Sequence, residues 1–335
     1  MTRRSFLAAV PFSGALGIAA EAKKLIRITG LDAYLLRGRV VLRLLTDAGI
    51  TGWGWSRFGV IAGGPEALKT ILEGDVKAVV ISQDPAFPAQ IRADLRRSLD
   101  YRGFEGLTRF AMSVVDIAVW DILGKAAGLP VYKMLGAVRH RMPAYASLNG
   151  ADRSAIDETL EKGYRAFKIK VGKFSLEDDV ERIEVARKVA GKDIRILVDA
   201  GLGFNRAEAL RRGRVYQELG CFWYEGALPP WDLEGYTELA HALDIRIVGV
   251  DVVQPDNPHA SGPTDWMEIA ASQGAGVELA SRAGGPVAMN MLCAIPNAIY
   301  IETDGSERVV KGEVLVSQTP GMGSELRVTP HKALP

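Results

Sequence analysis

The spacing of hydrophobic residues divides the chain into two parts that meet near residue 143. Residues 25–55 contain two or three apolar stretches typical of β-strands, and Asp47-Ala48-Gly49 supplies a hairpin turn. Residues 64–99 and 106–127 have the apolar spacing of helices. An antiparallel sheet followed by helices predicts an α+β unit for this first part.

Beyond Pro143, short apolar strands alternate with amphipathic helices. This alternation predicts a parallel sheet, either open or closed into a barrel. Strands are expected at 143–147, 166–171, 194–199, 221–225, 245–251, 276–281 and 298–302. Helices are expected at 152–162, 177–190, 206–219, 233–243, 264–273 and 286–294.

The strand "AFKIKV", residues 166–171, is apolar except for Lys168 and Lys170. Residues two apart in a strand point to the same face, so both ammonium groups project the same way. On an outer edge strand, such a pair would be ordinary solvated charge. The interpretation therefore depends on which residues the neighbouring strands carry.

Carboxylates recur along the strands that follow. Lys170, Asp199, Glu225 and Asp251 come at intervals of 29, 26 and 26 residues, each at or near the end of a predicted strand. A strand–helix unit of a barrel takes about 30 residues, and active sites collect where its strands end. The spacing predicts a magnesium site of three oxygen ligands, and the absence of histidine from the set argues against zinc. Taken singly, Asp199 is also compatible with a helix cap and Glu225 with a loop charge.

These groups suggest a reaction. Metal bound to a carboxylate substrate stabilises the enediolate that forms when the α-proton leaves. Lys170 is the candidate base, and the second ammonium of Lys168 favours its neutral, proton-accepting form. Lys168 is then an electrostatic neighbour that also reaches the substrate carboxylate.

The composition bounds the remaining possibilities. The chain has 335 residues, 48% of them hydrophobic, and its net charge of +1 comes from interspersed signs. That length allows two domains, and no basic run indicates nucleic acid or a membrane surface as a partner. Cys221 and Cys293 lie too far apart for a zinc knuckle and are too few for a disulfide framework, so we expect core residues. Whether they pair is left open.

The first residues carry an export pattern. Arg3-Arg4-Ser5-Phe6-Leu7 resembles a twin-arginine signal, and the apolar stretch to Ala20 is shorter than the roughly 20 residues of a spanning helix. An ordinary signal or an anchor is the alternative. We expect cleavage near Ala22 and a periplasmic or other extracytoplasmic mature protein with no membrane segment. The expected divisions are 1–22, 23–142 and 143–335.

Several motifs, in order, carry a family resemblance that covers nearly all of residues 25–330. They are "SVVDIAVWDILGKAAGLPVYKMLG", "KIK", "VDAG", "WYEGALPPWDLEGYTEL", "DVVQPD" and "PGMG". They resemble the enolase superfamily, in its mandelate racemase/muconate lactonizing enzyme branch. The resemblance implies an α/β fold: a TIM-like modified (β/α)7β barrel closed by an N-terminal α+β capping domain, to which the C-terminal segment returns. It also implies Mg²⁺ and an enolate intermediate.

The chain departs from the family pattern at several positions. Arg282 stands where the racemase-type histidine would be, and Asp256 would be the partner of that histidine. The loop between the first two strands, which usually sets specificity, is reduced to a tight turn. The usual Asp-x-Asn, Glu-Glu-Pro and Gly-Trp-Gly-Glu have become Asp199-Ala200-Gly201, Glu225-Gly226-Ala227 and Gly52-Trp53-Gly54-Trp55.

The largest departure is "IRIVGVDVVQPD", where about twenty residues, including the usual third-ligand glutamate and a helix, are missing by the resemblance. Adjacent parallel strands need a crossover of roughly a dozen residues or more, so we expect that two strands cannot both fit. Either one fused strand leaves the barrel one strand–helix unit short, or the region is rearranged. In the fused case Asp251 takes the third ligand position.

The function predicted from these features is Mg²⁺-dependent abstraction of an α-proton from a small carboxylic acid, in a racemase or an acid-sugar dehydratase. Arg282 favours one-base chemistry such as syn elimination over two-base racemisation. A degenerate barrel that binds a ligand or partner with little turnover is the alternative. A Schiff-base aldolase using Lys170 would leave the carboxylates without a role. We expect a homo-oligomer.

Overall fold

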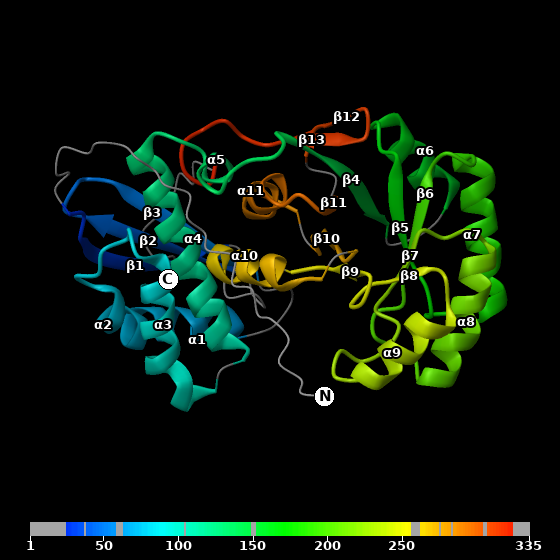
Figure 1. Ribbon diagram of the computed structural model, residues 1–335, viewed down its shortest axis with the longest axis horizontal. Coiled ribbons are helices and arrows are strands. Elements are labelled where there is room, and N and C mark those ends of the chain that lie inside the picture. Colours follow the sequence, from blue (N-terminus) through cyan, green and yellow to red (C-terminus); the bar gives the residue numbers. More distant parts are fainter. Residues whose placement is uncertain are drawn as a thin grey trace, which may run out of the picture.

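The computed structural model describes residues 25–36, 38–57, 63–103, 105–148, 152–255, 262–274, 276–282, 284–303 and 307–323. They form an N-terminal lobe and a barrel lobe, with α10 and α11 between them (Figure 1). Within these ranges, every helix is too short or too polar to cross a membrane.

The N-terminal lobe is an antiparallel sheet covered by helices, as predicted. Its strands are β1 (Ile28–Leu36), β2 (Arg39–Thr46) and β3 (Thr51–Arg57), in the order β1-β2-β3. Leu36 pairs with Arg39, which confirms the tight turn expected between the first two strands. The helical segments are α1 (Gly64–Ile71), η1 (Leu72–Val76), α2 (Lys77–Val80), α3 (Pro88–Leu99), η2 (Asp100–Arg102) and α4 (Leu107–Ala127).

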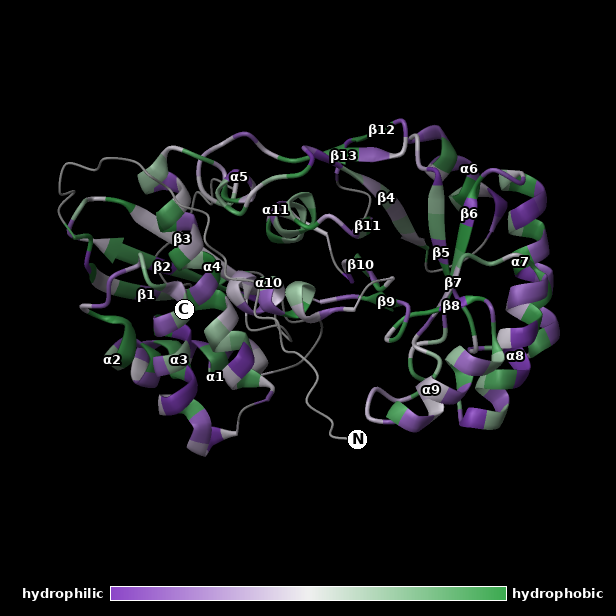
Figure 2. Ribbon diagram, viewed as in Figure 1, coloured by the Kyte–Doolittle hydropathy of each residue, from purple (hydrophilic) through white to green (hydrophobic). Residues whose placement is uncertain are grey.

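Helix α4 packs so closely on β3 that two positions of the strand require glycine. A Cβ atom at Gly52 would collide with the carbonyl oxygen of Ala118, and one at Gly54 with that of Val114. The buried residues of the sheet and of the helices form one core. Figure 2 shows hydrophobic stretches on both the strands and the helices of this lobe. The sheet cannot move away from α4 without exposing this core.

The barrel lobe confirms the predicted strand–helix alternation. Eight parallel strands follow the order β8-β7-β6-β5-β4-β11-β10-β9, and a bridge between Val248 and Val252 joins the two ends. The strands are β4 (Arg141–Leu148), β5 (Ala166–Lys170), β6 (Arg195–Asp199), β7 (Trp223–Glu225), β8 (Arg246–Ile247), β9 (Val252–Val253), β10 (Glu278–Ala280) and β11 (Ala298–Thr303). The helices are α5 (Val131–Met134), α6 (Arg153–Glu161), α7 (Leu176–Ala190), α8 (Arg206–Glu218), α9 (Leu233–Ala242), α10 (Pro263–Ser272) and α11 (Pro286–Ala294).

Strands β8 and β9 decide between the two alternatives for "IRIVGVDVVQPD", a single fused strand or a rearranged region. Both strands form, with no helix between them, so the region is rearranged and is not a single fused strand. The expectation that two parallel strands cannot both fit is wrong, because each is only two residues long and one turn returns the chain to the start of the next. In that turn the N–H of Asp251 donates to the carbonyl of Ile247 (2.9 Å), and Gly249 has a φ of 107°.

The last described segment ties the barrel back to the N-terminal lobe. After the hairpin of β12 (Val309–Val310) and β13 (Glu313–Leu315), which pairs with β4, the chain reaches helix α4. There the buried carboxylate of Asp121 accepts from the N–H groups of Met322 (2.9 Å) and Trp53 (3.0 Å). Cys221 and Cys293 are buried free thiols, as expected for core residues.

A second buried carboxylate, Asp116 of α4, holds the first turn of α10. It accepts from the backbone N–H and the hydroxyl of Thr264, each at 2.7 Å. Arg92 of α3 reaches Asp265 of the same turn at 2.6 Å. Burial raises the pKa of Asp116 to about 7, although its hydrogen bonds to Thr264 and the charge of Arg92 act in the opposite direction.

The raised pKa predicts a pH dependence of stability. The folded protein retains the Asp116 proton up to about pH 7, while the unfolded chain releases it near its ordinary value of 3.8. The free energy of unfolding should therefore fall as pH rises between these values, by at most roughly 4 kcal/mol from this group. Asp116→Asn keeps the side-chain shape and should show a smaller fall. Urea unfolding at pH 5 and pH 8 measures the difference, and equal falls in variant and wild type would contradict this assignment.

Candidate active site

The interior of the barrel is apolar at one end and charged at the other. Tyr145, Leu197 and Trp223 belong to a buried apolar cluster inside the strands. Lys168 lies beyond this cluster, and its side chain is only 2% exposed. Lys168 therefore lies at the boundary between the apolar interior of the barrel and a layer of charged side chains near the carboxyl ends of the strands.

Three carboxylates surround the Lys168 ammonium. Its Nζ atom lies 3.0 Å from Glu225 Oε1, and 3.3 Å from both Asp199 Oδ2 and Glu302 Oε2. Burial by itself would lower the pKa of Lys168, but the charges of Glu225, Glu302 and Asp199 outweigh it, so the pKa is raised. Lys168 is therefore held in its charged form.

The carboxyl groups respond to the same environment in opposite ways. Burial raises the pKa of Glu225 to about 7, and the charges of Asp199 and Glu302 add to the effect against the influence of Lys168. Burial also disfavours ionised Asp199, but Lys168 and Lys170 outweigh it and hold its pKa below the ordinary value. Asp199 is thus the more firmly ionised of the two.

Lys170 lies in a different environment from Lys168. Its ammonium contacts Asp199 Oδ2, yet 45% of its side chain is exposed. Both lysines reach the same carboxylate, as expected for residues two apart on one strand. One ammonium is buried among carboxylates, while the other lies at the open end of the barrel, where a small molecule can approach it.

Glu302, at the end of β11, was not among the predicted site residues. Besides contacting Lys168, it accepts a hydrogen bond from the hydroxyl of Tyr145 (3.0 Å). Glu302 is the next-to-last residue of its strand "AIYIET", so its place near a strand end is the sequence signal that could have identified it. Gln254, just after β9, donates to Glu225 Oε2 (3.2 Å) and is a further member of the layer.

The other predicted residues lie elsewhere. Asp251 lies in the turn before β9, where its carboxylate accepts from the N–H of Ile247 (2.8 Å), so the structure does not bring it into the Lys168 cluster. Asp256 falls outside the described residues. Arg282 is exposed just after β10. In the part of the chain that the structure describes, no three His, Cys, Asp or Glu side chains are arranged to hold a metal.

Asp199 and Glu225 nevertheless suit a magnesium ion that keeps waters. Their strands are paired in register at these two residues, and Mg²⁺ is commonly bound by one or two protein carboxylates. Both carboxylates are mostly buried and in contact with Lys168, so a metal there must replace that contact. The ligand roles of Asp199, Glu225 and Asp251 stay predictions.

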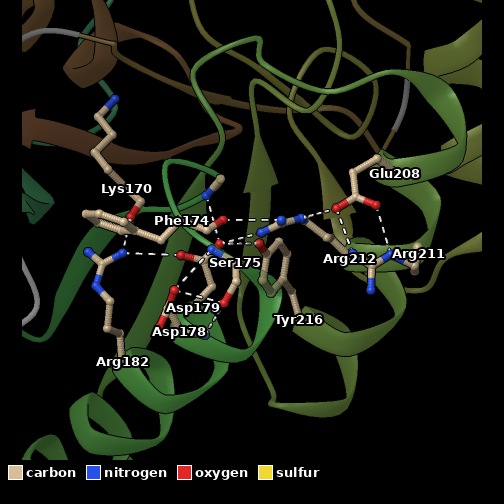
Figure 3. Close-up of polar contacts among 11 residues, drawn as sticks. Lys170, Phe174, Ser175, Asp178, Asp179, Arg182, Glu208, Arg211, Arg212 and Tyr216 are labelled. Atoms are coloured by element: carbon tan, nitrogen blue, oxygen red, sulfur yellow. Dashed lines mark hydrogen bonds and ion pairs between the residues drawn. The ribbon is translucent and has the colours of Figure 1, made fainter.

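A buried polar cluster fixes the loop that follows Lys170 (Figure 3). Its centre is Asp179 of α7, whose side chain is inaccessible to solvent. The Asp179 carboxylate accepts from the N–H of Gly172 (2.8 Å) and from Arg212 (2.8 Å). Arg182, which also contacts Asp179, donates to the carbonyl of Lys170 (3.0 Å). The backbone on both sides of Val171 is thereby anchored to helices outside the barrel.

The same cluster connects the loops after β5 and β6. The ring of Phe204 lies so close to Gly172 that a Cβ atom would collide with it, and the φ of Gly172 is 83°. The Arg212 guanidinium lies over the same Phe204 ring, 4.8 Å from the ring centroid. Movement of the Lys170 loop is therefore coupled by packing to the loop that follows Asp199.

Comparisons with known proteins agree with this architecture. Residues 35–136 match the model of the mandelate racemase/muconate lactonizing enzyme N-terminal domain, and residues 151–249 match the enolase C-terminal domain-like model. A D-galactonate dehydratase from Xanthomonas axonopodis pv. citri is 30% identical over 278 residues, which cover 73% of this chain and 71% of that protein. The chain belongs to the mandelate racemase/muconate lactonizing enzyme branch of the enolase superfamily.

Further relatives of this superfamily member are lyases and isomerases. An L-talarate/galactarate dehydratase from Salmonella typhimurium is 28% identical, with 81% of this chain and 76% of the relative covered. A racemase from Streptomyces coelicolor, solved with bound magnesium, has a TM-score of 0.83 at 26% identity, with 90% of this chain and 98% of that one covered. These names place the chain among the lyases and isomerases of the superfamily.

The family match also locates the departure. The C-terminal domain match ends at Gly249, inside the turn that joins β8 to β9 without a helix. The end of the match and the shortened connection thus coincide. The barrel strands after the match, β9, β10 and β11, still complete the ring, and β11 supplies Glu302.

Proposed function

We propose that this chain removes the α-proton of an acid-sugar carboxylate and eliminates water from the resulting enolate, with Lys170 as the base. The observation that carries the proposal is the difference between the two lysines. Lys168 is buried among three carboxylates that keep it protonated, whereas Lys170 is half-exposed at the end of β5. Of these two lysines, Lys170 is the one placed to meet a substrate.

The reaction divides between the residues as follows. The Lys170–Asp199 contact opens, and the neutral Lys170 amine takes the proton from the substrate α-carbon. The electron pair of the broken C–H bond moves into the carboxylate to give the enolate. Loss of the β-hydroxyl, with the proton returned by Lys170, releases water and leaves a product that tautomerises to a keto acid. Lys168 stays charged throughout and balances the negative charge near the substrate carboxylate.

Asp199 and Glu225 would hold Mg²⁺, which when bound supplies positive charge that stabilises the enolate form of a carboxylate. The chain contributes a buried pair of oxygen ligands and the ammonium of Lys168 beside them. Relatives named as dehydratases act on acid sugars, and one similar structure contains magnesium, which supports this use of the site.

Elimination is favoured over racemisation because of Arg282. By resemblance, Arg282 occupies the position of the second-base histidine. A guanidinium remains protonated in proteins and cannot accept the second proton. One base suffices for elimination, in which the same group can accept and return the proton on one face of the substrate.

Metal binding provides the first test of this proposal. Mg²⁺ should raise the melting temperature of the wild type, and Asp199→Ala should abolish the increase because it removes a ligand. Asp251→Ala is the matched control, since the Asp251 carboxylate is bonded to the turn at Ile247. Scanning fluorimetry with and without Mg²⁺ measures all three. An unchanged shift in Asp199→Ala would reject Asp199 as a ligand, and loss of the shift in Asp251→Ala would restore Asp251 as one.

Exchange of the α-proton tests the base. Bound acids should exchange this proton with deuterium from solvent even when they cannot complete a reaction. Lys170→Met should slow exchange by about 10²–10⁴-fold, the usual contribution of a general base, while Mg²⁺ binding persists. Lys168→Met removes the buried ammonium beside the reaction and should slow exchange less.

The control for this test is Lys173→Met, a lysine of the same loop whose ammonium lies over the Phe174 ring. NMR over a panel of sugar acids and α-hydroxy acids measures the exchange of all four proteins. Exchange by Lys170→Met at the wild-type rate would move the base elsewhere. A wild type that binds Mg²⁺ but exchanges none of the acids would favour the binding-protein alternative.

We also propose that the protein is exported by the twin-arginine route. The support is the sequence Arg3-Arg4-Ser5-Phe6-Leu7 and the short apolar stretch after it, both outside the described residues. The mature protein should begin near Lys23 and be recovered outside the cytoplasm. N-terminal sequencing of protein from fractionated native cells checks this. Recovery of the whole population in the cytoplasm with Met1 or Thr2 at its N-terminus would reject the proposal.

A further inference from the structure

The end of the barrel opposite Lys170 has a cavity with a volume of about 350 Å³. It lies where β6, β7 and β8 begin and where α7, α8 and α9 end, so it is separate from the candidate active site. Four of its lining side chains are cationic and one, Asp244, is acidic. The cavity is therefore strongly biased towards negatively charged ligands.

Two of these cations are held on the faces of one aromatic ring. The guanidinium of Arg195 lies 4.3 Å from the centroid of Phe222, and that of Arg246 lies 4.4 Å from it. The two guanidiniums are thus within about 10 Å of each other, close enough for one ligand with several anionic groups to contact both. Arg246 is ion-paired with Glu278, whereas the described part of the chain gives Arg195 no acidic partner.

The orientation of both guanidiniums is fixed before any ligand arrives. Arg195 donates to the hydroxyl of Tyr300 (3.2 Å), and Arg246 donates through Nε to Glu278 (3.0 Å). A guanidinium has five N–H donors, and the hydrogen bonds in the described part of the chain use one on each. The remaining donors can form paired bonds to a carboxylate or phosphate at a reduced cost in side-chain entropy.

Hydrogen bonds to the protein backbone explain the presence of Arg187 in the cavity lining, but not that of Arg195 and Arg246. Arg187 donates to the carbonyl groups of Gly191, Ile194 and Gly220, so it satisfies backbone at the end of α7 and in the loops beside it. Arg195 and Arg246 have no such backbone partners among the described residues. Lys192, also exposed in the lining, adds positive charge beside them.

We propose that this cavity binds a small organic polyanion, whose carboxylate or phosphate groups contact both Arg195 and Arg246. The site is independent of the proposed elimination reaction, because it lies at the opposite end of the barrel and shares no residue with it. The negative charge of Asp244 repels an anionic ligand and lowers its affinity. Removing that charge should therefore strengthen binding, which tests the proposal separately from the arginines.

The experiment titrates the protein with citrate at constant ionic strength, without added Mg²⁺, and follows melting temperature and the heat of binding. Wild type should show saturable binding. Arg195→Gln and Arg246→Gln should each weaken it by about tenfold or more, because each removes a charged hydrogen-bonding group. Asp244→Asn should strengthen it severalfold, because it removes the opposing charge. Inorganic phosphate in a parallel titration distinguishes a carboxylate ligand from a phosphate ligand.

Arg214→Gln is the matched control, since Arg214 is exposed on α8 and does not line the cavity. It should bind citrate as the wild type does. Failure of both anions to saturate, or unchanged affinity in the Arg195 and Arg246 variants, would overturn the proposal. If either arginine variant does not fold, the expected gain in Asp244→Asn still decides, and a loss or no change there rejects the site.

Discussion

The site depends on one buried ammonium group. Lys168 lies inside the barrel with three carboxylates within 3.3 Å, and a charge in this position is stable only while its partners remain. Removing one partner of a buried ion pair typically costs about 3–5 kcal/mol, because the other charge is left uncompensated. The four residues come from β5, β6, β7 and β11, so the register of half the barrel is constrained by this contact.

The strand pairing places these groups at one level. Lys170 pairs with Asp199, and Asp199 pairs with Glu225, so the three side chains occupy neighbouring positions at the ends of adjacent strands. Below them, Tyr145 fills the interior and directs its hydroxyl to Glu302. Outside the barrel, Asp179 anchors the loop after Lys170 (Figure 3). The position of each charged group is thus determined by packed elements on both sides of the strand.

Most of the fold follows from hydrophobic spacing, because parallel strands buried on both faces alternate with one-sided helices along the chain. The spacing of strand-end carboxylates identified Asp199 and Glu225 as neighbours of the lysines for the same reason. Asp251 shows where that reasoning stops. It has the expected spacing, but β8 is only two residues long, so Asp251 lies in the turn before β9 and its carboxylate accepts a hydrogen bond from the N–H of Ile247. Local turn geometry, which the spacing does not contain, determined its place.

Glu302 was missed for a related reason. The interval from Asp251 to Glu302 is 51 residues, close to two repeats, but the predicted strand between them, 276–281, ends in Ser281, so the run of strand-end carboxylates is interrupted before Glu302. In a closed barrel, however, the last strand is a neighbour of the first, and β11 pairs with β4. Closure brings a residue that is distant in sequence next to Lys168. A search of every strand end, irrespective of spacing, would have found it.

The balance of charge in this layer connects its structure to the proposed chemistry. Two ammonium groups face three carboxylates, so the layer carries one excess negative charge when all are ionised, and the raised pKa of Glu225 reflects this excess together with burial. A divalent cation would reverse the sign, and a substrate carboxylate would then restore neutrality. Metal and substrate charge thus complement one another at this end of the barrel.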